Sequence, residues 1–190
     1  MEFLGKSVLV TGGAVRIGRA ISLAFAARGA RVLIHYRRSA EAAEALRAEL
    51  EGKNIAAWAI RADLSVGNEC LRLMDAAVKQ AGDVDILVNN AAVFHKDTIA
   101  SMSEEGIYEE LRANLVAPML LTQALAARGR PGRIVNLLDR RVTSFDGACV
   151  PYVLSKKALL DFTRIAALQL APLITVNAVA PGAVLPPPGE

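Results

Sequence analysis

Tyr152 and Lys156 lie four residues apart in the segment YVLSK, within a stretch whose composition is typical of a helix. Residues at this spacing share one face of a helix. A nearby ammonium stabilises tyrosinate and lowers the pKa of the phenol, so Tyr152 would be able to pass a proton near neutral pH. The same spacing also arises by chance in many helices. Tyr152 and Lys156 are therefore candidate catalytic residues whose role depends on the motifs around them.

A glycine-containing loop, TGGAVRIG, spans residues 11–18. Gly12 and Gly13 allow a tight turn, and Gly18 lets the following helix approach a sheet closely. The N-terminus of that helix would offer free N–H groups to a pyrophosphate. Arg16 stands where the middle glycine of such a loop is expected. The loop predicts a dinucleotide site, with a purely structural turn as the alternative.

A basic segment, Tyr36-Arg37-Arg38-Ser39, ends the second apolar run of the chain. Enzymes that prefer NAD carry an acid at this point, about 20 residues past the glycine loop, which binds the ribose 2′-hydroxyl. A carboxylate would repel a 2′-phosphate, whereas guanidinium groups form charge-assisted bonds to it. The segment therefore predicts NADP(H) as the cofactor. The alternative, two solvated arginines at a helix start, is unfavourable to the helix dipole.

Short apolar runs alternate along the chain with longer Ala/Leu-rich helical patterns. Strands are expected at residues 7–10, 31–36, 55–60, 85–91, 133–138 and 174–182, and helices at 17–28, 40–50, 67–81, 104–127 and 151–170. The strand runs are continuously apolar, which indicates burial on both faces. Strands separated by helices predict an α/β fold, a Rossmann-type doubly wound parallel sheet flanked by helices in a single domain.

Composition excludes several other classes of protein. The 190 residues carry a net charge of +3 with scattered basic residues, which gives no indication of nucleic-acid binding. No apolar run approaches the roughly 18 residues of a membrane span, and the first residues lack the pattern of a secretory signal. Cys70 and Cys149 are far apart and lack metal-ligand spacing, so we expect reduced structural thiols, no metal site and a cytoplasmic protein.

In their order along the chain, these motifs resemble those of the short-chain dehydrogenase/reductase family. The shared set is TGGAVRIG, the pair Asp63–Leu64, NNAA at residues 89–92, the helical Asn114, YVLSK, and APG at residues 180–182. The resemblance covers nearly all of the chain. Within the family, the chain is most similar to the pteridine reductases of the dihydropteridine and dihydromonapterin type. These share the arginine in the glycine loop, an HY-x-RS-like end of the second strand, and an aspartate in place of the usual catalytic serine.

The resemblance implies a cofactor site along the ends of the strands. The residues expected to bind NADP(H) are Gly12, Arg16, Ile17, Gly18, Tyr36, Arg37, Arg38, Ser39, Asp63, Leu64, Asn90, Ala91, Ala92, Tyr152, Lys156, Pro181 and Gly182. Lys156 would hold the nicotinamide ribose. Asn114 resembles the family asparagine that bends its helix and steadies a water leading to the lysine, so it joins the expected catalytic set.

An aspartate occupies the position of the family's catalytic serine, thirteen residues before Tyr152. This residue is Asp139. A carboxylate is a poor partner for a developing oxyanion but a good acceptor for the N–H and amino groups of a pterin ring, and it can relay a proton to Tyr152. Two alternatives stay open: Asp139 could cap a turn, or Ser144 could take the place of the serine.

Phe94 follows NNAAV at a position where the resembling reductases stack a flat pterin against the nicotinamide, an arrangement that aromatic rings favour. The alternative is a phenylalanine that packs in a loop. Arg16 would reach over the cofactor phosphates to the pterin edge. Phe94, Arg16, Asp139 and Tyr152 are therefore the expected substrate contacts.

The resulting hypothesis is an NADPH-dependent reductase that transfers a hydride to a dihydrobiopterin-, dihydromonapterin- or dihydrofolate-like substrate. A carbonyl reductase, such as a 3-oxoacyl-thioester reductase, is the first alternative and would have serine at position 139. A nucleotide-binding protein without catalysis is the second, and it would lack Tyr152 or Lys156. The resemblance also implies a homo-oligomer, with a homotetramer as the family's arrangement.

Two features depart from the family pattern. Arg140 and Arg141 follow the aspartate and could pair with an acidic tail of the substrate, such as a folate glutamate. The resembling enzymes also continue past the APG loop into a substrate-covering loop, a further helix and an edge strand, whereas this chain ends in LPPPGE. We expect either an incomplete chain or a domain without that strand and lid, and favour an incomplete chain because natural sheets avoid exposed edges.

Overall fold

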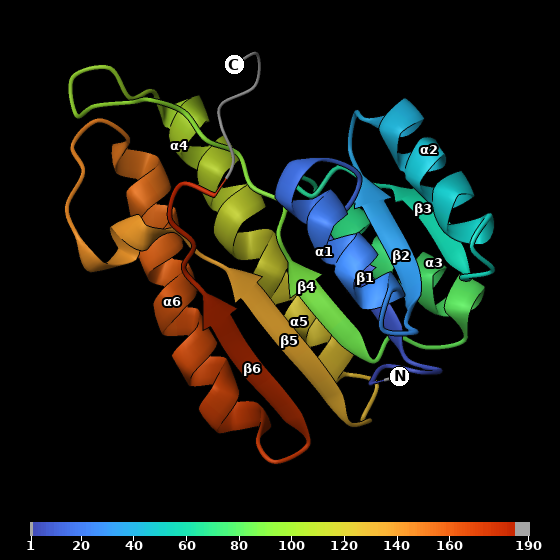
Figure 1. Ribbon diagram of the computed structural model, residues 1–190. Helices are drawn as coiled ribbons and strands as arrows, with labels where there is room; N and C mark the ends of the chain where they lie inside the picture. The colour runs from blue at the N-terminus through green and yellow to red at the C-terminus, as the bar shows by residue number, and fades with distance from the viewer. Residues whose placement is uncertain (1, 185–190) are drawn as a thin grey trace.

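The structure is a computed structural model that describes residues 2–184. Its centre is a six-stranded parallel sheet with the order β3-β2-β1-β4-β5-β6 (Figure 1). The strands are β1 (Ser7–Val10), β2 (Arg31–Tyr36), β3 (Ala57–Arg61), β4 (Ile86–Asn89), β5 (Gly132–Leu137) and β6 (Ile174–Val179). The strand order reverses between β1 and β4, which leaves a crevice at their carboxyl ends. The predicted doubly wound fold is confirmed.

Helices cover both faces of this sheet. They are α1 (Arg16–Ala26), α2 (Ala40–Glu51), α3 (Gly67–Ala81), α4 (Glu104–Leu111), α5 (Ala117–Ala126) and α6 (Val150–Leu170), with a π-helical turn η1 (Arg112–Val116) and a 3₁₀ turn η2 (Arg140–Thr143). None of the helices in the described part of the chain combines the length and apolar character needed to cross a bilayer.

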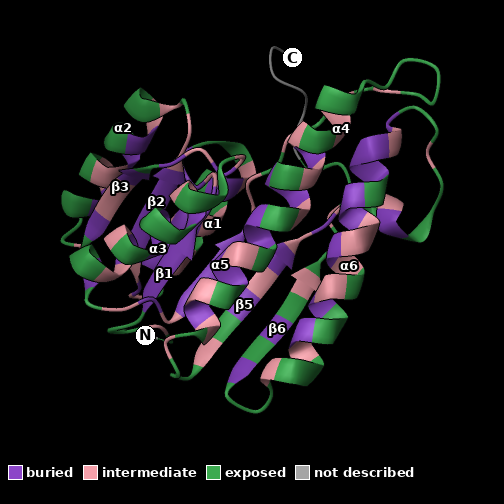
Figure 2. Cartoon of the chain, turned by 180° about the vertical axis from the view of Figure 1, so that it is seen from behind, coloured by how far each residue is buried: buried purple, intermediate pink, exposed green. Residues whose placement is uncertain are grey.

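Two hydrophobic cores form because successive side chains of a strand point to opposite faces. Leu9, Leu33 and Leu87 pack in one core with α3, α5 and α6. Val8 and Val10 pack in the other core with α1 and α2. The central strands β1 and β4 are therefore buried along their whole length (Figure 2), as their continuous apolar runs predict. The expected burial on both faces is corrected for β6, where buried and exposed residues alternate, since α1 and α2 pack against β1, β2 and β4 on that side of the sheet.

The segment expected to be one uninterrupted helix over residues 104–127 is divided, and this expectation is corrected. Between α4 and α5, the π-helical turn η1 carries Asn114, and the N–H of Ala117 donates to the carbonyl of Arg112. Pro118 has no N–H to donate to the carbonyl of Asn114 four residues earlier, and its ring would clash there in a regular helix. The widened turn aims the Asn114 side chain at Val93, where its amide donates to the carbonyl and accepts from the N–H, both at 2.8 Å.

The turn between β1 and α1 is tight at two positions. Gly12 has a φ of 61° and Arg16 has a φ of 50°, so the arginine adopts the left-handed conformation that glycine favours. Gly18 lies so close to the turn that a Cβ would overlap the carbonyl oxygen of Gly12 and lie 2.7 Å from Nδ2 of Asn90. The first turn of α1 is therefore held directly against the loop and the end of β4.

We expect Gly18→Ala to lower the free energy of unfolding by about 1–3 kcal/mol, because the added methyl group must push α1 away from the loop. Urea unfolding followed by circular dichroism measures this change. Gly52→Ala is the matched control, since Gly52 ends α2 with a φ of −60° and its Cβ would meet nothing closer than 3.4 Å. Equal stability of the two variants would show that the close approach at Gly18 does not matter.

Candidate active site

A cavity of about 390 Å³ opens at the reversal of strand order between β1 and β4. It is lined by Gly12, Val15, Arg16, Ile17, Gly18, His35, Arg37, Asp63, Leu64, Ser65, Asn90, Ala91, Ala92, Val93 and Ala113. Most of these are residues expected from the sequence to bind the cofactor. Tyr36, Arg38 and Ser39 were also expected there but are not among the lining residues, and Arg38 is exposed. Of the basic segment, only Arg37 lines the cavity.

A smaller cavity of about 160 Å³ adjoins the first and shares Ile17, Asn90 and Ala92 with it. Its other lining residues are Leu137, Leu138, Asp139, Tyr152, Lys156, Pro181 and Gly182. The structure thus brings the YVLSK pair, the aspartate and the APG loop together beside the glycine loop. Ser144, the alternative to Asp139, is exposed and is not among the residues that line this cavity.

The hydroxyl of Thr11 ties the glycine loop to the end of β4. Its Oγ1 accepts from the backbone N–H groups of Asn90 at 2.9 Å and Ala91 at 3.0 Å, and donates to the carbonyl of Val88 at 3.3 Å. The amide of Asn90 donates in return to the carbonyls of Thr11 at 2.9 Å and Gly12 at 3.2 Å. These bonds fix the floor that both cavities share.

His35, at the end of β2, supports the same loop and was not expected from the sequence. Its Nδ1 accepts from the N–H of Gly12 at 3.0 Å, and its Nε2 lies 3.1 Å from the carbonyl of Ala62. Burial lowers the pKa of His35 to about 4. The neutral ring therefore carries its hydrogen on Nε2 and connects the glycine loop to the end of β3.

Arg37 is paired with two carboxylates at the outer end of the larger cavity. Its Nε donates to Asp63 at 2.9 Å, and its Nη1 lies 3.6 Å from Glu109. Burial alone would raise the pKa of Asp63, but hydrogen bonds from Ser65 and the charge of Arg37 together lower it. Arg37 is thus a half-buried guanidinium that is held in place at the rim of the cavity.

Tyr152 and Lys156 lie on one face of α6, as their spacing predicts, and the ammonium is 5.9 Å from the centre of the phenol ring, but the hydroxyl and the ammonium have different hydrogen-bond partners. The phenol of Tyr152 donates to Oδ2 of Asp139 at 3.3 Å, while the ammonium of Lys156 donates to the carbonyl of Leu137 at 2.8 Å. Burial, followed by the charge of Asp139, raises the pKa of Tyr152. Burial lowers the pKa of Lys156 to about 8. The expected lowering of the phenol's pKa is therefore corrected: in this structure Tyr152 is a neutral proton donor.

Asp139 both caps a turn and faces Tyr152, so the turn cap and the position beside the phenol do not exclude each other. Its Oδ1 accepts from the N–H of Arg141 at 2.9 Å, which caps the 3₁₀ turn η2. The guanidinium of Arg141 also contacts both carboxylate oxygens, at 3.2 and 3.1 Å, and its Nε donates to Asp146 at 2.7 Å. Arg141 is thus already paired within the chain, whereas Arg140 is exposed.

Phe94 lies beside the same phenol. Its ring centroid is 4.8 Å from that of Tyr152 in an edge-to-face arrangement, and the guanidinium of Arg141 lies 5.9 Å from its centre. The Phe94 side chain stays about half exposed, at 45%. Asn114, at the π-helical turn, donates to Oγ of Ser155 at 3.1 Å and so connects the loop before Phe94 to the helix that carries Lys156.

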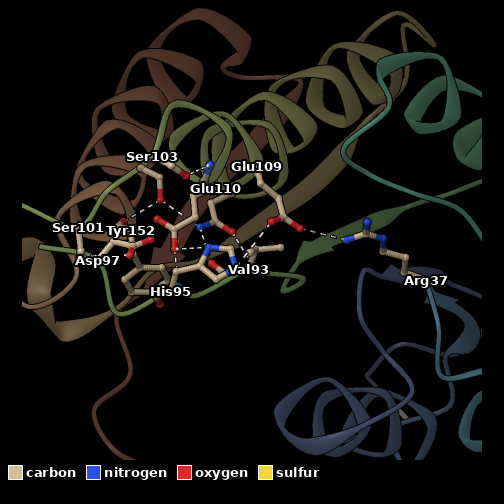
Figure 3. A network of polar contacts seen from close by, with 12 residues as sticks. Arg37, Val93, His95, Asp97, Ser101, Ser103, Glu109, Glu110 and Tyr152 are labelled. Atoms are coloured by element: carbon tan, nitrogen blue, oxygen red, sulfur yellow. Dashed lines mark hydrogen bonds and ion pairs between the residues drawn. The ribbon is translucent and has the colours of Figure 1, made fainter.

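Glu110 on α4 is fully buried behind this loop and was also not expected (Figure 3). Its Oε1 accepts from the N–H of His95 at 2.6 Å, while Oε2 has no hydrogen-bond partner. Burial raises the pKa of Glu110. Its neighbour Glu109 lies between Nε2 of His95, at 3.7 Å, and Arg37. A polar network therefore runs from the loop around Phe94 to the rim of the larger cavity.

We expect Glu110→Gln to raise the free energy of unfolding near neutral pH by about 1 kcal/mol, because an amide keeps the acceptor for His95 without burying a charge. The raised pKa means that the folded chain binds this proton more tightly than the unfolded chain does. The carboxyl therefore destabilises the wild type as the pH rises above 4.5, the ordinary pKa.

Urea unfolding of both proteins near neutral pH and near pH 4.5 measures this difference, which should shrink at the lower pH. Asp75→Asn, at an exposed carboxyl on α3, controls for the loss of one negative charge. A Gln variant that is less stable than the wild type at both pH values would contradict the prediction.

The described residues contain no cluster of three or more His, Cys, Asp or Glu that could hold a metal ion. Cys70 and Cys149 are both buried and free, as their separation in the sequence predicts. Burial raises the pKa of the Cys70 thiol to about 11, which keeps it protonated and unreactive.

Comparison with known proteins extends these observations. The family model described as short chain dehydrogenase matches residues 6–188. A 3-oxoacyl-[acyl-carrier-protein] reductase of Staphylococcus epidermidis is 36% identical, with 96% of this chain and 76% of the relative covered. An uncharacterized oxidoreductase of Bacillus subtilis is also 36% identical, with 96% of this chain and 64% of the relative covered.

Solved structures agree with the fold. A short chain dehydrogenase from Burkholderia cenocepacia in complex with NADP is 37% identical with a TM-score of 0.92, over 96% of this chain and 76% of the other. FolM alternative dihydrofolate reductase 1 from Brucella canis, complexed with NADP, is 35% identical with a TM-score of 0.93, over 98% and 77%. The prediction of NADP(H) agrees with the cofactor of these neighbours. The chain belongs to the short-chain dehydrogenase/reductase family.

Proposed function

We propose that the protein is an NADPH-dependent reductase of a pteridine-type substrate. The observation that carries the proposal is the hydrogen bond from the phenol oxygen of Tyr152 to Oδ2 of Asp139, with 3.3 Å between the two oxygens. Asp139 stands at the position where the family's carbonyl reductases have a serine. The proposal keeps the oxidoreductase activity and the Rossmann-type fold of the relatives described above and differs in the substrate.

The larger cavity fits a dinucleotide phosphate. Gly18 leaves no side chain between the loop and the start of α1, since even a Cβ would overlap the carbonyl of Gly12. Free N–H groups at a helix start favour phosphate oxygens. Arg37 would bind the 2′-phosphate at the rim, and Arg16, Ile17 and Asn90 would line the phosphates and the nicotinamide end. Bound NADPH supplies the hydride.

Proton handling falls to three side chains of this chain. The phenol of Tyr152 is neutral and donates along a hydrogen bond that already points to Asp139. When a hydride adds to a C=N carbon of the substrate, the adjacent ring nitrogen would take this proton, directly or through Asp139, and leave a tyrosinate that regains a proton from water. Lys156, with its pKa lowered to about 8 by burial, would bind the nicotinamide ribose and place a positive charge near the phenol.

The substrate class follows from the acceptor character of Asp139. Ionised carboxylates only accept hydrogen bonds, which matches the N–H and amino groups of a pterin or folate ring. The half-exposed ring of Phe94 offers an apolar face beside the same phenol. The similarity to a protein described as an alternative dihydrofolate reductase supports the same class.

A carbonyl reductase is the second candidate, favoured by the 36% identity to a 3-oxoacyl-[acyl-carrier-protein] reductase. Such a reaction develops negative charge on the substrate oxygen beside the catalytic donor. A carboxylate in the place of a hydroxyl would repel that charge rather than donate to it. Asp139 therefore disfavours this candidate.

A substrate panel with NADPH separates the two candidates. We expect turnover of dihydrobiopterin, dihydromonapterin or dihydrofolate and little reduction of simple ketones or 3-oxoacyl thioesters. Asp139→Ser should lower pteridine reduction by about 100-fold or more, because the acceptor for the ring donors and the proton relay are both lost. Unchanged pteridine reduction in this variant, or a wild type that prefers ketones, would contradict the proposal.

We expect Arg37→Ala to raise the dissociation constant for NADPH by about 10- to 100-fold, because a charge-assisted bond to the 2′-phosphate is lost. Binding of NADH, which has no 2′-phosphate, should change far less. Fluorescence titration of both nucleotides measures this ratio. Arg38→Ala provides the comparison: its side chain lies outside the cavity and should affect the ratio less. A larger change of this ratio in Arg38→Ala than in Arg37→Ala would assign the 2′-phosphate contact to Arg38 instead.

A further inference from the structure

We propose that Arg141 is the positioning residue of the substrate site, which fixes the Asp139 carboxylate toward Tyr152 and holds the ring of Phe94 against the same phenol. The inference deepens the proposed function and rests on it for the nature of the substrate, but not for the arrangement of the three side chains. The sequence does not indicate this role, because there Arg141 is expected, together with Arg140, to pair with an acidic tail of the substrate.

Arg141 occupies both oxygens of Asp139. The backbone N–H donates to Oδ1 at 2.9 Å, and Nη1 lies 3.2 Å from Oδ1 and 3.1 Å from Oδ2. The phenol of Tyr152 donates to Oδ2. A carboxylate offers about four acceptor positions, and these four hydrogen bonds occupy them, three from Arg141 and one from Tyr152. A donor on a substrate must therefore share or displace one of these bonds, and Arg141 determines at which oxygen that is possible.

A second carboxylate anchors Arg141 itself. Its Nε donates to Oδ2 of Asp146 at 2.7 Å, and Oδ1 of Asp146 accepts from the N–H of Ala148 at 3.0 Å. The guanidinium therefore connects the start of the loop between β5 and α6 to its end, just before the helix turn that carries Tyr152. Its side chain is only 25% exposed, so these bonds are partly shielded from water.

The same guanidinium also contacts Phe94. It lies 5.9 Å from the centre of the Phe94 ring, within the range of a cation–π contact. Phe94 in turn packs edge-on against Tyr152 at 4.8 Å. Arg141 thus contacts both Asp139 and Phe94. Its charge also opposes the rise in the pKa of Tyr152 that burial and Asp139 cause.

The alternative is that Arg141 only stabilises the loop. The two roles differ in their dependence on Asp139. The positioning of Asp139 acts through the carboxylate, so most of the effect of removing Arg141 on kcat should disappear when Asp139 is already replaced, and only the contact with Phe94 is still lost. A general loosening of the loop would lower kcat in both backgrounds. Double-mutant cycles measure this difference directly.

The test uses Arg141→Met, Asp139→Asn and the double variant in the full chain. We expect Arg141→Met to lower kcat for dihydropteridine reduction by about 30-fold or more, and to change kcat less than about threefold in the Asp139→Asn background. Arg141→Lys should restore part of the loss, because an ammonium can pair with Asp139 but lacks the planar fork that reaches Asp139 and Asp146 through different nitrogens. Arg47→Met is the matched control, since Arg47 also bridges two carboxylates but on the remote helix α2.

A binding measurement accompanies the kinetics. Quenching of biopterin fluorescence by the NADP-loaded protein should show about a tenfold higher dissociation constant for Arg141→Met, with thermal stability lowered no more than in Arg47→Met. Equal losses of kcat in both Asp139 backgrounds, or unchanged binding and kcat in Arg141→Met, would overturn the inference.

The substrate preference of the wild type distinguishes a failure of the inference about Arg141 from a failure of the proposed function. If the wild type reduces carbonyl compounds but neither binds biopterin nor reduces dihydropteridines, the proposed function fails, and the same cycle is measured with the carbonyl substrate. Additive losses there would overturn the role of Arg141 as well. A wild type that reduces neither class of substrate would overturn both.

Discussion

The hydrogen bonds of the Thr11 hydroxyl hold the two halves of the site together. β1 and β4 are neighbours in the sheet, yet the segments that follow them leave in opposite directions because the strand order reverses there. Without a connection, the crevice would have no fixed floor. Thr11 satisfies two backbone N–H groups at the end of β4, and the Asn90 amide satisfies two carbonyls of the glycine loop in return. Asn90 then lines both cavities, so their relative position follows from this contact.

Local irregularities of the backbone occur where this floor meets the site. Arg16 adopts a left-handed φ of 50°, a conformation that costs about 1–2 kcal/mol for a residue other than glycine. The π-helical turn at Asn114 exchanges regular helix bonds for a side chain that binds Val93. Such departures persist only where surrounding contacts stabilise them, and they are common at functional sites.

The sequence predicts those parts of the structure that depend on local pattern. Apolar runs identify every strand, although β6 is exposed on one face. The glycine loop, the YVLSK segment and the shared family motifs identify the residues of the candidate site, whose roles stay predictions. The fold could be predicted because glycine geometry, helix spacing and the burial of the central strands leave direct traces in residue type.

Other features could not be predicted because they arise between segments far apart in the chain. His35 supports the glycine loop through contacts with residues on two other strands. Glu110 is buried only because the loop after β4 folds over it. The pKa of Tyr152 could not be inferred from the spacing of Lys156, since the ammonium turns to Leu137 and the phenol to Asp139. A motif identifies which side chains meet, but burial and the third partner decide their charge.

The carboxylate at position 139 changes the electrostatics of the whole cluster. A serine at this point would bring no charge, whereas a half-buried carboxylate must be compensated to remain ionised. This chain supplies the compensation from Arg141, which is itself balanced by Asp146, so the loop before α6 forms a chain of alternating charges. The phenol of Tyr152 adds no charge of its own while it donates to Asp139.

This charge distribution favours one kind of substrate. A substrate that brings N–H donors strengthens this arrangement, because each donor replaces water at an ionised acceptor. A substrate that develops negative charge at the same place weakens it, because Arg141, the cation bonded to Asp139, is already shared between two carboxylates.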